Sequence, residues 1–224
     1  MLRPAAVLFD VGDTLLKEAR FDLEAGIRAV LPNEETLVSE LARDFRIQIQ
    51  RLHACRRDIL LSTWLRENVP ALAAHSDESV ENAVWSAVVT LLPMRGVAAV
   101  LNRLRQDGIA MAAVSNASFS GRILFRELAR HGLAEALSFV LSSGEVGVRK
   151  PAPEIFHEAV SRLGKPAQST WYVGDTFGED VEGALCVELV PIWLHHGPAP
   201  SSLVRSVNVV RDWAEFIDLY DASH

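Results

Sequence analysis

Beyond Pro93, the sequence alternates between stretches with helical spacing and short apolar runs. Four of these runs are IAMAAV, FVLSS, TWYVGD and LVPIWL, and the last segment, VNVVRDWAEFIDLY, is expected to add a strand and a helix. This alternation is typical of right-handed crossover units that build a parallel sheet. The opening run AAVLF, at residues 5–9, is expected to join the same sheet. The sequence therefore predicts an α/β fold with a parallel sheet.

A helical block is expected to interrupt this pattern after the first strand. The segment that starts at Asn33, an expected helix cap, repeats apolar residues at helical spacing. A second helix is expected to begin at Ser76, with two acids in its first turn, and to stop at Pro93. Two domains are therefore predicted: a core of residues 1–17 and 93–224, and an inserted helical domain of residues 18–92.

Composition and charge narrow the range of partners. The chain has 224 residues, of which 49% are hydrophobic, and its formal net charge is −7. A net negative chain disfavours a nucleic-acid binder, which needs clustered positive charge, and no apolar stretch reaches membrane-spanning length. The two cysteines are far apart in sequence and suggest neither a disulfide framework nor a zinc ribbon. We expect a cytoplasmic protein without nucleic-acid or membrane partners.

Polar and charged residues follow the predicted strands. They are Asp10 after the first strand, Ser115 and Asn116 after IAMAAV, Lys150 in the loop GEVGVRKP, and Asp175 and Asp180 after TWYV. Ligands bind at the carboxyl ends of the strands in such sheets. Three carboxylates gathered there would repel one another unless a cation neutralised them, and oxygen ligands favour Mg²⁺ over zinc. In the alternative interpretation, Asp175 and Asp180 cap the following helix, Ser115 and Asn116 end a strand, and Lys150 is a solvated loop residue.

Four segments, FDVGDTLL, VSNAS, GVRKP and VGDTFGED, occur in this order along the chain. Together they resemble the four motifs of the haloacid dehalogenase-like hydrolases, most of which are magnesium-dependent phosphatases. The resemblance spans the whole chain. It implies a Rossmann-like core with a small helical cap inserted after the first motif, and a small phosphorylated molecule as substrate.

The resemblance also implies a role for each matching residue. Asp10 matches the nucleophile that becomes an aspartyl-phosphate and also holds the metal. Ser115, with Asn116 beside it, is implied to bind the phosphoryl group, and Lys150 to supply positive charge to that group and to the nucleophile. Asp175 is implied to bind Mg²⁺, and Asp180 to bind or orient it.

The first motif departs from the family at Gly12. Phosphatases of this family usually carry a second aspartate there, which donates a proton to the leaving oxygen. The Gly12 carbonyl can still bind the metal, but the position has no side chain for acid–base chemistry. Loss of a positioned proton donor costs on the order of 10²–10⁴ in rate, so an acyl or aryl phosphate would suffer least. Asp13 is an alternative acid, one residue out of place.

Two further interpretations stay open. Haloacid dehalogenases also lack the second acid, because halide leaves without a proton, but their fourth motif lacks the metal-binding GD pattern that VGDTFGED retains. A phosphate- or partner-binding module whose chemistry has decayed is the third possibility. The chain is expected to be a monomer or a homodimer.

The expected cap carries several residues with side chains able to contact a substrate. Four arginines on its long helix are expected to be a solvated face rather than an anion site, and two tryptophans are expected to pack in the core of the cap. These residues are Arg46, Arg51, Arg56, Arg57, Trp64 and Trp85. Residues 16–20 and 92–96 are the expected hinges for opening and closing of the cap.

Overall fold

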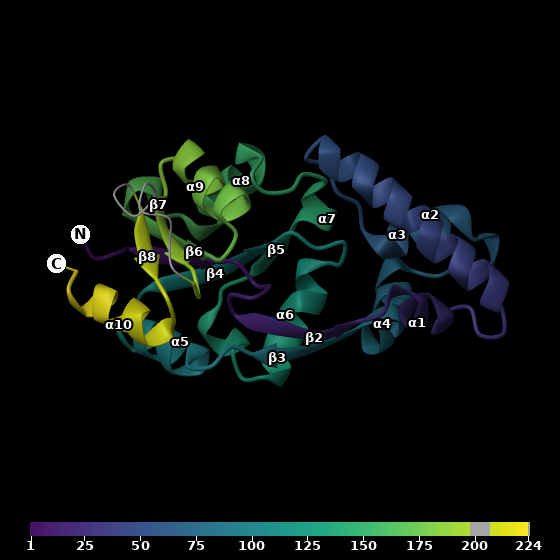
Figure 1. Ribbon diagram of the computed structural model, residues 1–224, viewed down its shortest axis with the longest axis horizontal. Coiled ribbons are helices and arrows are strands. Elements are labelled where there is room, and N and C mark those ends of the chain that lie inside the picture. Colours follow the sequence, from purple (N-terminus) through teal and green to yellow (C-terminus); the bar gives the residue numbers. More distant parts are fainter. Residues whose placement is uncertain (198–206, 224) are drawn as a thin grey trace.

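A six-stranded parallel sheet forms the centre of the computed structural model, which describes residues 1–197 and 207–223 (Figure 1). The strand order is β5-β4-β1-β6-β7-β8, and neighbouring strands run parallel. The strands are β1 (Ala6–Phe9), β4 (Ala110–Ser115), β5 (Val140–Ser142), β6 (Thr170–Gly174), β7 (Val190–Leu194) and β8 (Asn208–Val210). The predicted α/β fold is confirmed. The parts of the expected core at 198–206 and at 224 lie outside the described residues.

Helices cover both faces of the sheet, so the central strands are apolar throughout. In β1, Val7 and Phe9 belong to the apolar cluster on one face and Leu8 to the cluster on the other, as the alternation of a strand requires. The first face is covered by α5 (Val97–Gln106), α6 (Gly121–Arg130) and α10 (Trp213–Asp221), and the second by α8 (Pro153–Leu163) and α9 (Glu182–Cys186). Figure 1 shows α5 and α10 on the side of the sheet opposite α8 and α9.

Short elements complete the connections between these strands and helices. They are η2 (Ala134–Ala136), α7 (Ser143–Val146), η3 (Ala167–Ser169) and the π-helical turn η4 (Phe177–Val181). None of the helices in the described ranges combines the length and the apolar composition that a membrane crossing requires.

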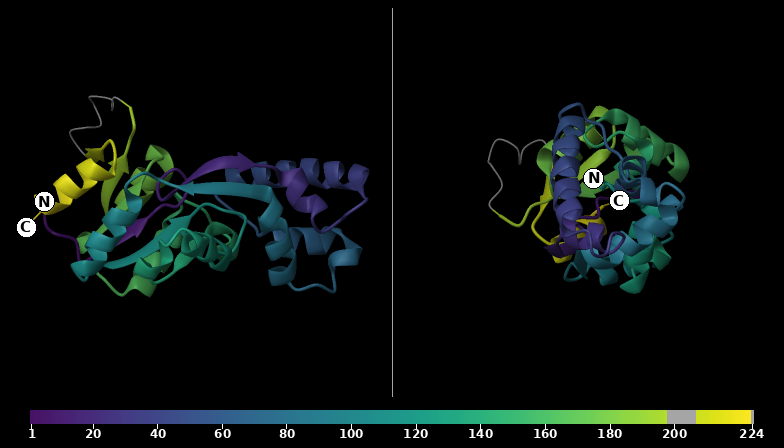
Figure 2. Two further views of the ribbon diagram at one scale, coloured as in Figure 1. Left: turned by 90° about the horizontal axis from the view of Figure 1, so that it is seen from below. Right: turned by 90° about the vertical axis from the view of Figure 1, so that its right-hand side faces the viewer.

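An antiparallel ribbon connects the sheet to a group of helices. The ribbon consists of β2 (Leu16–Phe21) and β3 (Val89–Pro93). Between these strands the chain forms α1 (Leu23–Arg28), α2 (Glu35–Ala54), α3 (Leu61–Asn68), η1 (Pro70–Leu72) and α4 (Asp77–Val88), here called the inserted helices. Figure 2 shows the inserted helices at the end of the molecule away from both termini.

The prediction that residues 18–92 are helical throughout is wrong at both ends. Residues 18–21 and 89–92 are strands of the ribbon, and the second predicted helix ends at Val88 instead of at Pro93. Val89 and Thr90 are β-branched and favour a strand, but the apolar run through Leu92 continues the helical spacing of α4. Residues 89–92 form a strand because they pair with β2, about 70 residues away in sequence. Local hydrophobic spacing does not reveal such a distant pairing.

One of the two predicted helix caps is correct. The Ser76 side chain accepts a hydrogen bond from the Ser79 N–H, so Ser76 caps α4 as predicted. Asn33 is not the cap of α2, because the residue in that position is Glu34, which makes no capping side-chain bond. Asn33 instead has a φ of 74°, a left-handed conformation that asparagine adopts more readily than most residues.

Candidate functional site

Three strands of the sheet end side by side at the candidate site. Strand β1 lies between β4 and β6, and all three run in the same direction. Asp10 follows β1, Ser115 ends β4 and Asp175 follows β6. The Asp10 N–H donates to the Val173 carbonyl at 2.8 Å, which extends the ladder by one residue and fixes the direction of the Asp10 backbone. These three residues therefore meet at one edge of the sheet.

Asp180 reaches the same edge from the turn η4. One carboxylate oxygen from each of Asp10, Asp175 and Asp180 lies within 4.8 Å of the others. The Asp180 carboxylate packs directly over Gly174, where a Cβ atom would lie 2.3 Å from the Asp180 Cγ. Glycine at the end of β6 is therefore a steric requirement of the acidic cluster.

Lys150 is buried among these acids, with 2% of its surface exposed. Its Nζ donates to Asp10 Oδ1 at 2.6 Å, to Asp180 Oδ1 at 2.7 Å and to the Tyr172 hydroxyl at 2.9 Å. A buried ammonium is expensive unless it is paired and hydrogen-bonded, and here the three donors of Lys150 all have acceptors. Lys150 thus contacts the carboxylates of Asp10 and Asp180, as predicted.

Asn116 holds the backbone of Lys150 with both ends of its amide. The Asn116 Nδ2 donates to the Lys150 carbonyl at 3.1 Å, and the Lys150 N–H donates to Asn116 Oδ1 at 2.8 Å. The same Nδ2 donates to Glu179 Oε2 at 2.8 Å, and Glu179 Oε1 accepts from Arg149 Nη2 at 2.9 Å. Asn116 therefore connects the end of β4 to the Lys150 loop and to η4.

Burial and charge shift the protonation of this cluster. Burial raises the pKa of Asp10, the Lys150 ammonium opposes that rise, the Asp180 carboxylate adds to it, and the resulting pKa is about 7. Burial also raises the pKa of Asp175, with the charges of Asp180 and Asp13 adding to the rise. Burial lowers the pKa of Lys150, but the Asp10 and Asp180 charges outweigh it and hold that pKa well above its ordinary value. Lys150 is therefore a fixed positive charge.

The donor set fits a divalent, oxygen-binding cation. With all three acids ionised, three carboxylates and one ammonium leave two negative charges, which one divalent ion would balance. The cluster offers carboxylate oxygens, which Mg²⁺ prefers. An added cation would also oppose the rise in the pKa of Asp10 that burial causes. The residues present therefore fit Mg²⁺.

Gly12 and Asp13 also line the acidic pocket that contains these residues. Gly12 has open space around it, since a Cβ atom there would have no neighbour within 4 Å, and its φ is not positive. Asp13 has a φ of 50°, in the left-handed region. A side chain at position 12 would thus be accommodated, and its absence here is not imposed by crowding.

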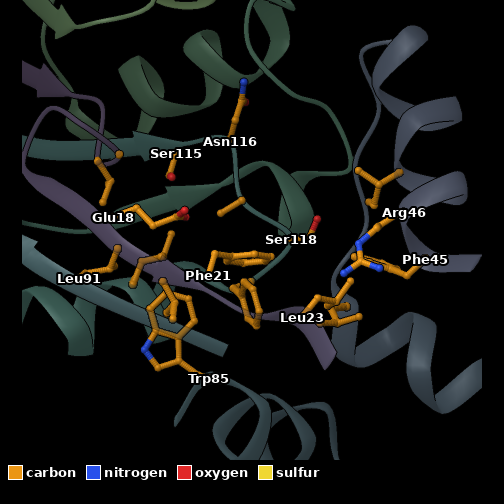
Figure 3. Close-up of a pocket in the computed structure, with 18 residues that line it drawn as sticks. Glu18, Phe21, Leu23, Phe45, Arg46, Trp85, Leu91, Ser115, Asn116 and Ser118 are labelled. Atoms are coloured by element: carbon orange, nitrogen blue, oxygen red, sulfur yellow. The ribbon is translucent and has the colours of Figure 1, made fainter. Parts of the chain in front are cut away.

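A second, mainly apolar cavity of about 350 Å³ adjoins the acidic pocket and shares Gly12, Ser115 and Asn116 with it. Figure 3 shows side chains from the ribbon, the inserted helices and the end of β4 around this cavity. Sequence analysis missed the cavity, because apolar residues from separate elements carry no motif. It also missed Tyr172, whose only signal is a hydroxyl inside an apolar strand.

The predictions for the inserted helices have mixed outcomes. Trp64 is buried and packs against Phe45, with ring centroids 5.2 Å apart, as predicted. Trp85 is also buried, but it lines the apolar cavity and its Nε1 donates to Glu127 Oε2 on α6 at 3.1 Å. All four arginines are exposed as predicted, and Arg46 also lines the cavity. The prediction that they share one helix is wrong for Arg56 and Arg57, because α2 ends at Ala54.

Known proteins resemble the chain over nearly all of its length. A family model of haloacid dehalogenase-like hydrolases matches residues 4–187. A glyceraldehyde 3-phosphate phosphatase from Methanopyrus kandleri is 31% identical, with 93% of this chain and 91% of the relative covered. A second glyceraldehyde 3-phosphate phosphatase, from Methanothermobacter thermautotrophicus, is 28% identical over 80% of each chain. The structure of a 2-haloacid dehalogenase from Pseudomonas syringae pv. Tomato DC3000 superposes with a TM-score of 0.68 at 20% identity, with 99% of both chains covered.

The parallel sheet and the cluster at its carboxyl edge are those of an α/β hydrolytic enzyme. The chain belongs to the haloacid dehalogenase-like hydrolases, as the four motifs predicted.

Proposed function

We propose that the protein is a Mg²⁺-dependent phosphatase that acts on a small phosphorylated metabolite through an aspartyl-phosphate on Asp10. The observation that carries the proposal is that Asp10, Asp175 and Asp180 each place a carboxylate oxygen within 4.8 Å of the others, while the Lys150 ammonium bonds to two of these acids. The phosphatase names of the relatives from Methanopyrus kandleri and Methanothermobacter thermautotrophicus support a phosphorylated substrate. The exposed, free Cys55 and Cys186 fit the reducing cytoplasm in which we expect the enzyme to act.

Asp10 acts as the nucleophile in this proposal. One of its carboxylate oxygens attacks phosphorus while the bond from phosphorus to the leaving oxygen breaks, which yields an acyl phosphate on Asp10 and the anion of the leaving group. Water then attacks the same phosphorus, and the bond to Asp10 breaks to release inorganic phosphate. In the first step the leaving anion takes a proton from solvent, and in the second step the attacking water releases a proton to solvent, so the protons balance.

Lys150, Ser115 and Asn116 position the phosphoryl group. The Lys150 ammonium stays charged between Asp10 and Asp180, so it offsets the negative charge that spreads over the phosphoryl oxygens in the transition state. The Ser115 hydroxyl lines both pockets and donates to a phosphoryl oxygen. Asn116 keeps the Lys150 loop in place through its paired hydrogen bonds.

Asp10, Asp175 and Asp180, together with the Gly12 carbonyl, would hold Mg²⁺ at the acidic pocket. When bound, the ion supplies positive charge that reduces the repulsion between the Asp10 carboxylate and the phosphoryl oxygens. Asp180 accepts hydrogen bonds from Lys150, Tyr172 and the Thr176 N–H, and these bonds fix the orientation of the carboxylate that would bind or orient the metal.

We also propose that residues 18–92 form a cap over the site. The inserted helices contribute Phe45, Arg46, Ile49 and Trp85 to the cavity that adjoins the acidic pocket, which supports a role in contacting the substrate body. The core of residues 1–17 and 93–224 would then carry the chemistry, and closure of the cap would exclude water.

The first test is phosphate release from p-nitrophenyl phosphate and acetyl phosphate in MgCl₂. We expect turnover by the natural chain, loss of turnover on chelation of the metal, and a decrease of at least about 10³-fold in kcat for Asp10→Asn, because the nucleophile is removed. Asp218→Asn, an exposed aspartate of α10, serves as the matched control and should retain full activity.

Two results would contradict the proposal. Equal turnover by Asp10→Asn and the natural chain would exclude Asp10 as the nucleophile. Release of halide from 2-chloropropionate in the presence of a chelator would instead identify a dehalogenase, the alternative with which the bare Gly12 position is compatible.

A further inference from the structure

We infer that the preferred substrates are aryl phosphates. The group esterified to the phosphate is an apolar body of one or two rings that carries no charged substituent. This inference rests on the proposed phosphatase function and specifies the substrate class. It is drawn from the apolar cavity beside the acidic pocket, which the four motifs do not describe.

The cavity lies where the leaving group of a phosphate ester must lie. It shares Gly12, Ser115 and Asn116 with the acidic pocket, so a phosphoryl group at Asp10 would extend its ester oxygen towards the shared residues. Its volume of about 350 Å³ is at the lower end of the range for small-molecule sites, roughly 300–1,000 Å³. The space therefore matches a compact body and not a dinucleotide or a long chain.

Most residues of the lining are apolar, whereas five, Glu18, Arg46, Ser115, Asn116 and Ser118, carry a hydroxyl, amide or charged group. Two of its polar side chains are already engaged, because Asn116 bonds to Lys150 and Glu179, and the Ser118 hydroxyl donates to Asp58 at 2.9 Å. A polyhydroxylated body would lose water there without replacing its hydrogen bonds, which costs affinity. The arrangement disfavours sugar phosphates.

An exposed aromatic side chain marks the cavity as a binding surface. Phe21 lines the cavity from β2 and yet has 51% of its surface exposed, while Ile49 and Leu91 in the same lining are partly exposed. Large apolar side chains at a concave site are partly exposed to water, and an apolar ligand that covers them removes this surface from water, which favours binding. An aromatic ring would do this and would also stack against phenylalanine.

The two charged residues of the lining are far apart in the close-up view. Glu18 comes from β2 of the ribbon, and Arg46 comes from α2 of the inserted helices (Figure 3). The Glu18 carboxylate repels a second phosphate or a carboxylate on a substrate body that lies beside it. This charge favours a body that carries no negative group there.

The missing acid at position 12 independently favours the same substrates. An alkoxide is a poor leaving group without a proton, whereas a phenoxide is stable enough to leave as the anion. Gly12 offers no proton donor. An aryl phosphate therefore satisfies both the chemistry of the acidic pocket and the shape and polarity of the adjoining cavity.

The test compares 2-naphthyl phosphate with acetyl phosphate in two matched variants of α2. Ile49 lines the cavity, whereas Ile47 on the same helix does not and is 42% exposed. For Ile49→Asn we expect kcat/KM to fall about tenfold with 2-naphthyl phosphate and less than twofold with acetyl phosphate, whose body is too small to reach the cavity. Ile47→Asn should leave both values unchanged. Because each ratio is taken within one substrate, the intrinsic reactivity of the two phosphates cancels.

Binding to the inactive Asp10→Asn variant, measured by calorimetry, separates this inference from the proposed function. We expect 2-naphthyl phosphate to bind at least about tenfold more tightly than glycerol 3-phosphate. Equal binding, or equal effects of Ile49→Asn on both substrates, would overturn the aryl preference while phosphatase activity stands. Absence of turnover with every phosphate would overturn the proposed function and this inference with it.

Discussion

Gly12 is the residue at which this chain departs from the pattern of its family. The position follows Asp10 by two residues, lines the acidic pocket, and has no atom within 4 Å of where a Cβ would be. Its φ is not positive, so a residue with a side chain can be placed there without backbone strain. The site therefore has space for an acidic side chain at position 12, which this sequence lacks.

Gly12→Asp is expected to raise kcat for glycerol 3-phosphate about 10²-fold, because an alkoxide needs a proton as it leaves. The gain with p-nitrophenyl phosphate should stay below about tenfold, since its leaving group departs as a stable anion. Steady-state kinetics on both substrates measures the difference. Gly12→Asn fills the same space without an acidic proton, and an equal gain from that variant would show that acid catalysis is not the missing feature.

At the scale of elements, α4 and α6 are joined by buried polar contacts. Glu81 of α4 is 3% exposed and accepts hydrogen bonds from both the N–H and the hydroxyl of Ser120, which caps α6. Burial raises the pKa of Glu81, although the bonds from Ser120 oppose the rise. The inserted helices are thus held to the sheet domain through a carboxyl group whose pKa burial raises.

Because the pKa of Glu81 is higher in the folded than in the unfolded chain, its contribution to stability is greatest below the ordinary value of 4.5 and is lost as the pH rises through the raised pKa. Glu81→Gln keeps a group that can bond to Ser120 but cannot ionise. Relative to the natural chain, the variant should therefore gain free energy of unfolding as the pH rises above about 4.5. Urea denaturation from about pH 3 to pH 7.5 measures this difference.

Glu78 on the same helix provides a control of opposite sign. Its pairing with Arg122 lowers its pKa, so its contribution to stability is present above about 4.5 and is lost as the pH falls. Glu78→Gln should therefore lose, and not gain, stability relative to the natural chain as the pH rises. The same pH trend in both variants would refute the assignment for Glu81.

At the scale of the whole molecule, the β2–β3 ribbon connects the inserted helices to the sheet (Figure 2). Lateral contacts, such as the hydrogen bond from Trp85 of α4 to Glu127 of α6, also join the inserted helices to the helices that cover the sheet. The larger apolar cluster continues from one face of the sheet into the inserted helices. Movement of the proposed cap would therefore bend the chain at residues 16–20 and 92–96 and separate these lateral contacts.

Trypsin can report this movement, because Lys17, Arg20 and Arg95 lie within the two proposed hinges and are exposed. Addition of MgCl₂ and beryllofluoride, a mimic of the phosphoryl group, should close the cap and slow cleavage at these sites several-fold. Cleavage after Arg43, on the outer surface of α2, should not change. Identical cleavage rates at the hinges with and without the mimic would rule out closure there.

Much of the fold could be predicted from local patterns. The strands that follow Pro93 and the cap at Ser76 follow from spacing and residue type, because each is set by neighbours close in sequence. The parallel sheet pairs distant strands, but the regular alternation of strands with helices indicates it. The β2–β3 ribbon could not, since a strand such as KEARF gains its stability from a partner far along the chain.

The residues of the acidic pocket were determined by the sequence itself: polar groups placed directly after apolar strands must meet at the carboxyl edge once the sheet is parallel, as Asp10, Ser115 and Asp175 do. Only the tertiary structure decided how Lys150 is held by Asn116 and which apolar side chains form the cavity. The reason is physical. A strand end is a property of the local chain, whereas a cavity is the space left where several separate elements fail to touch.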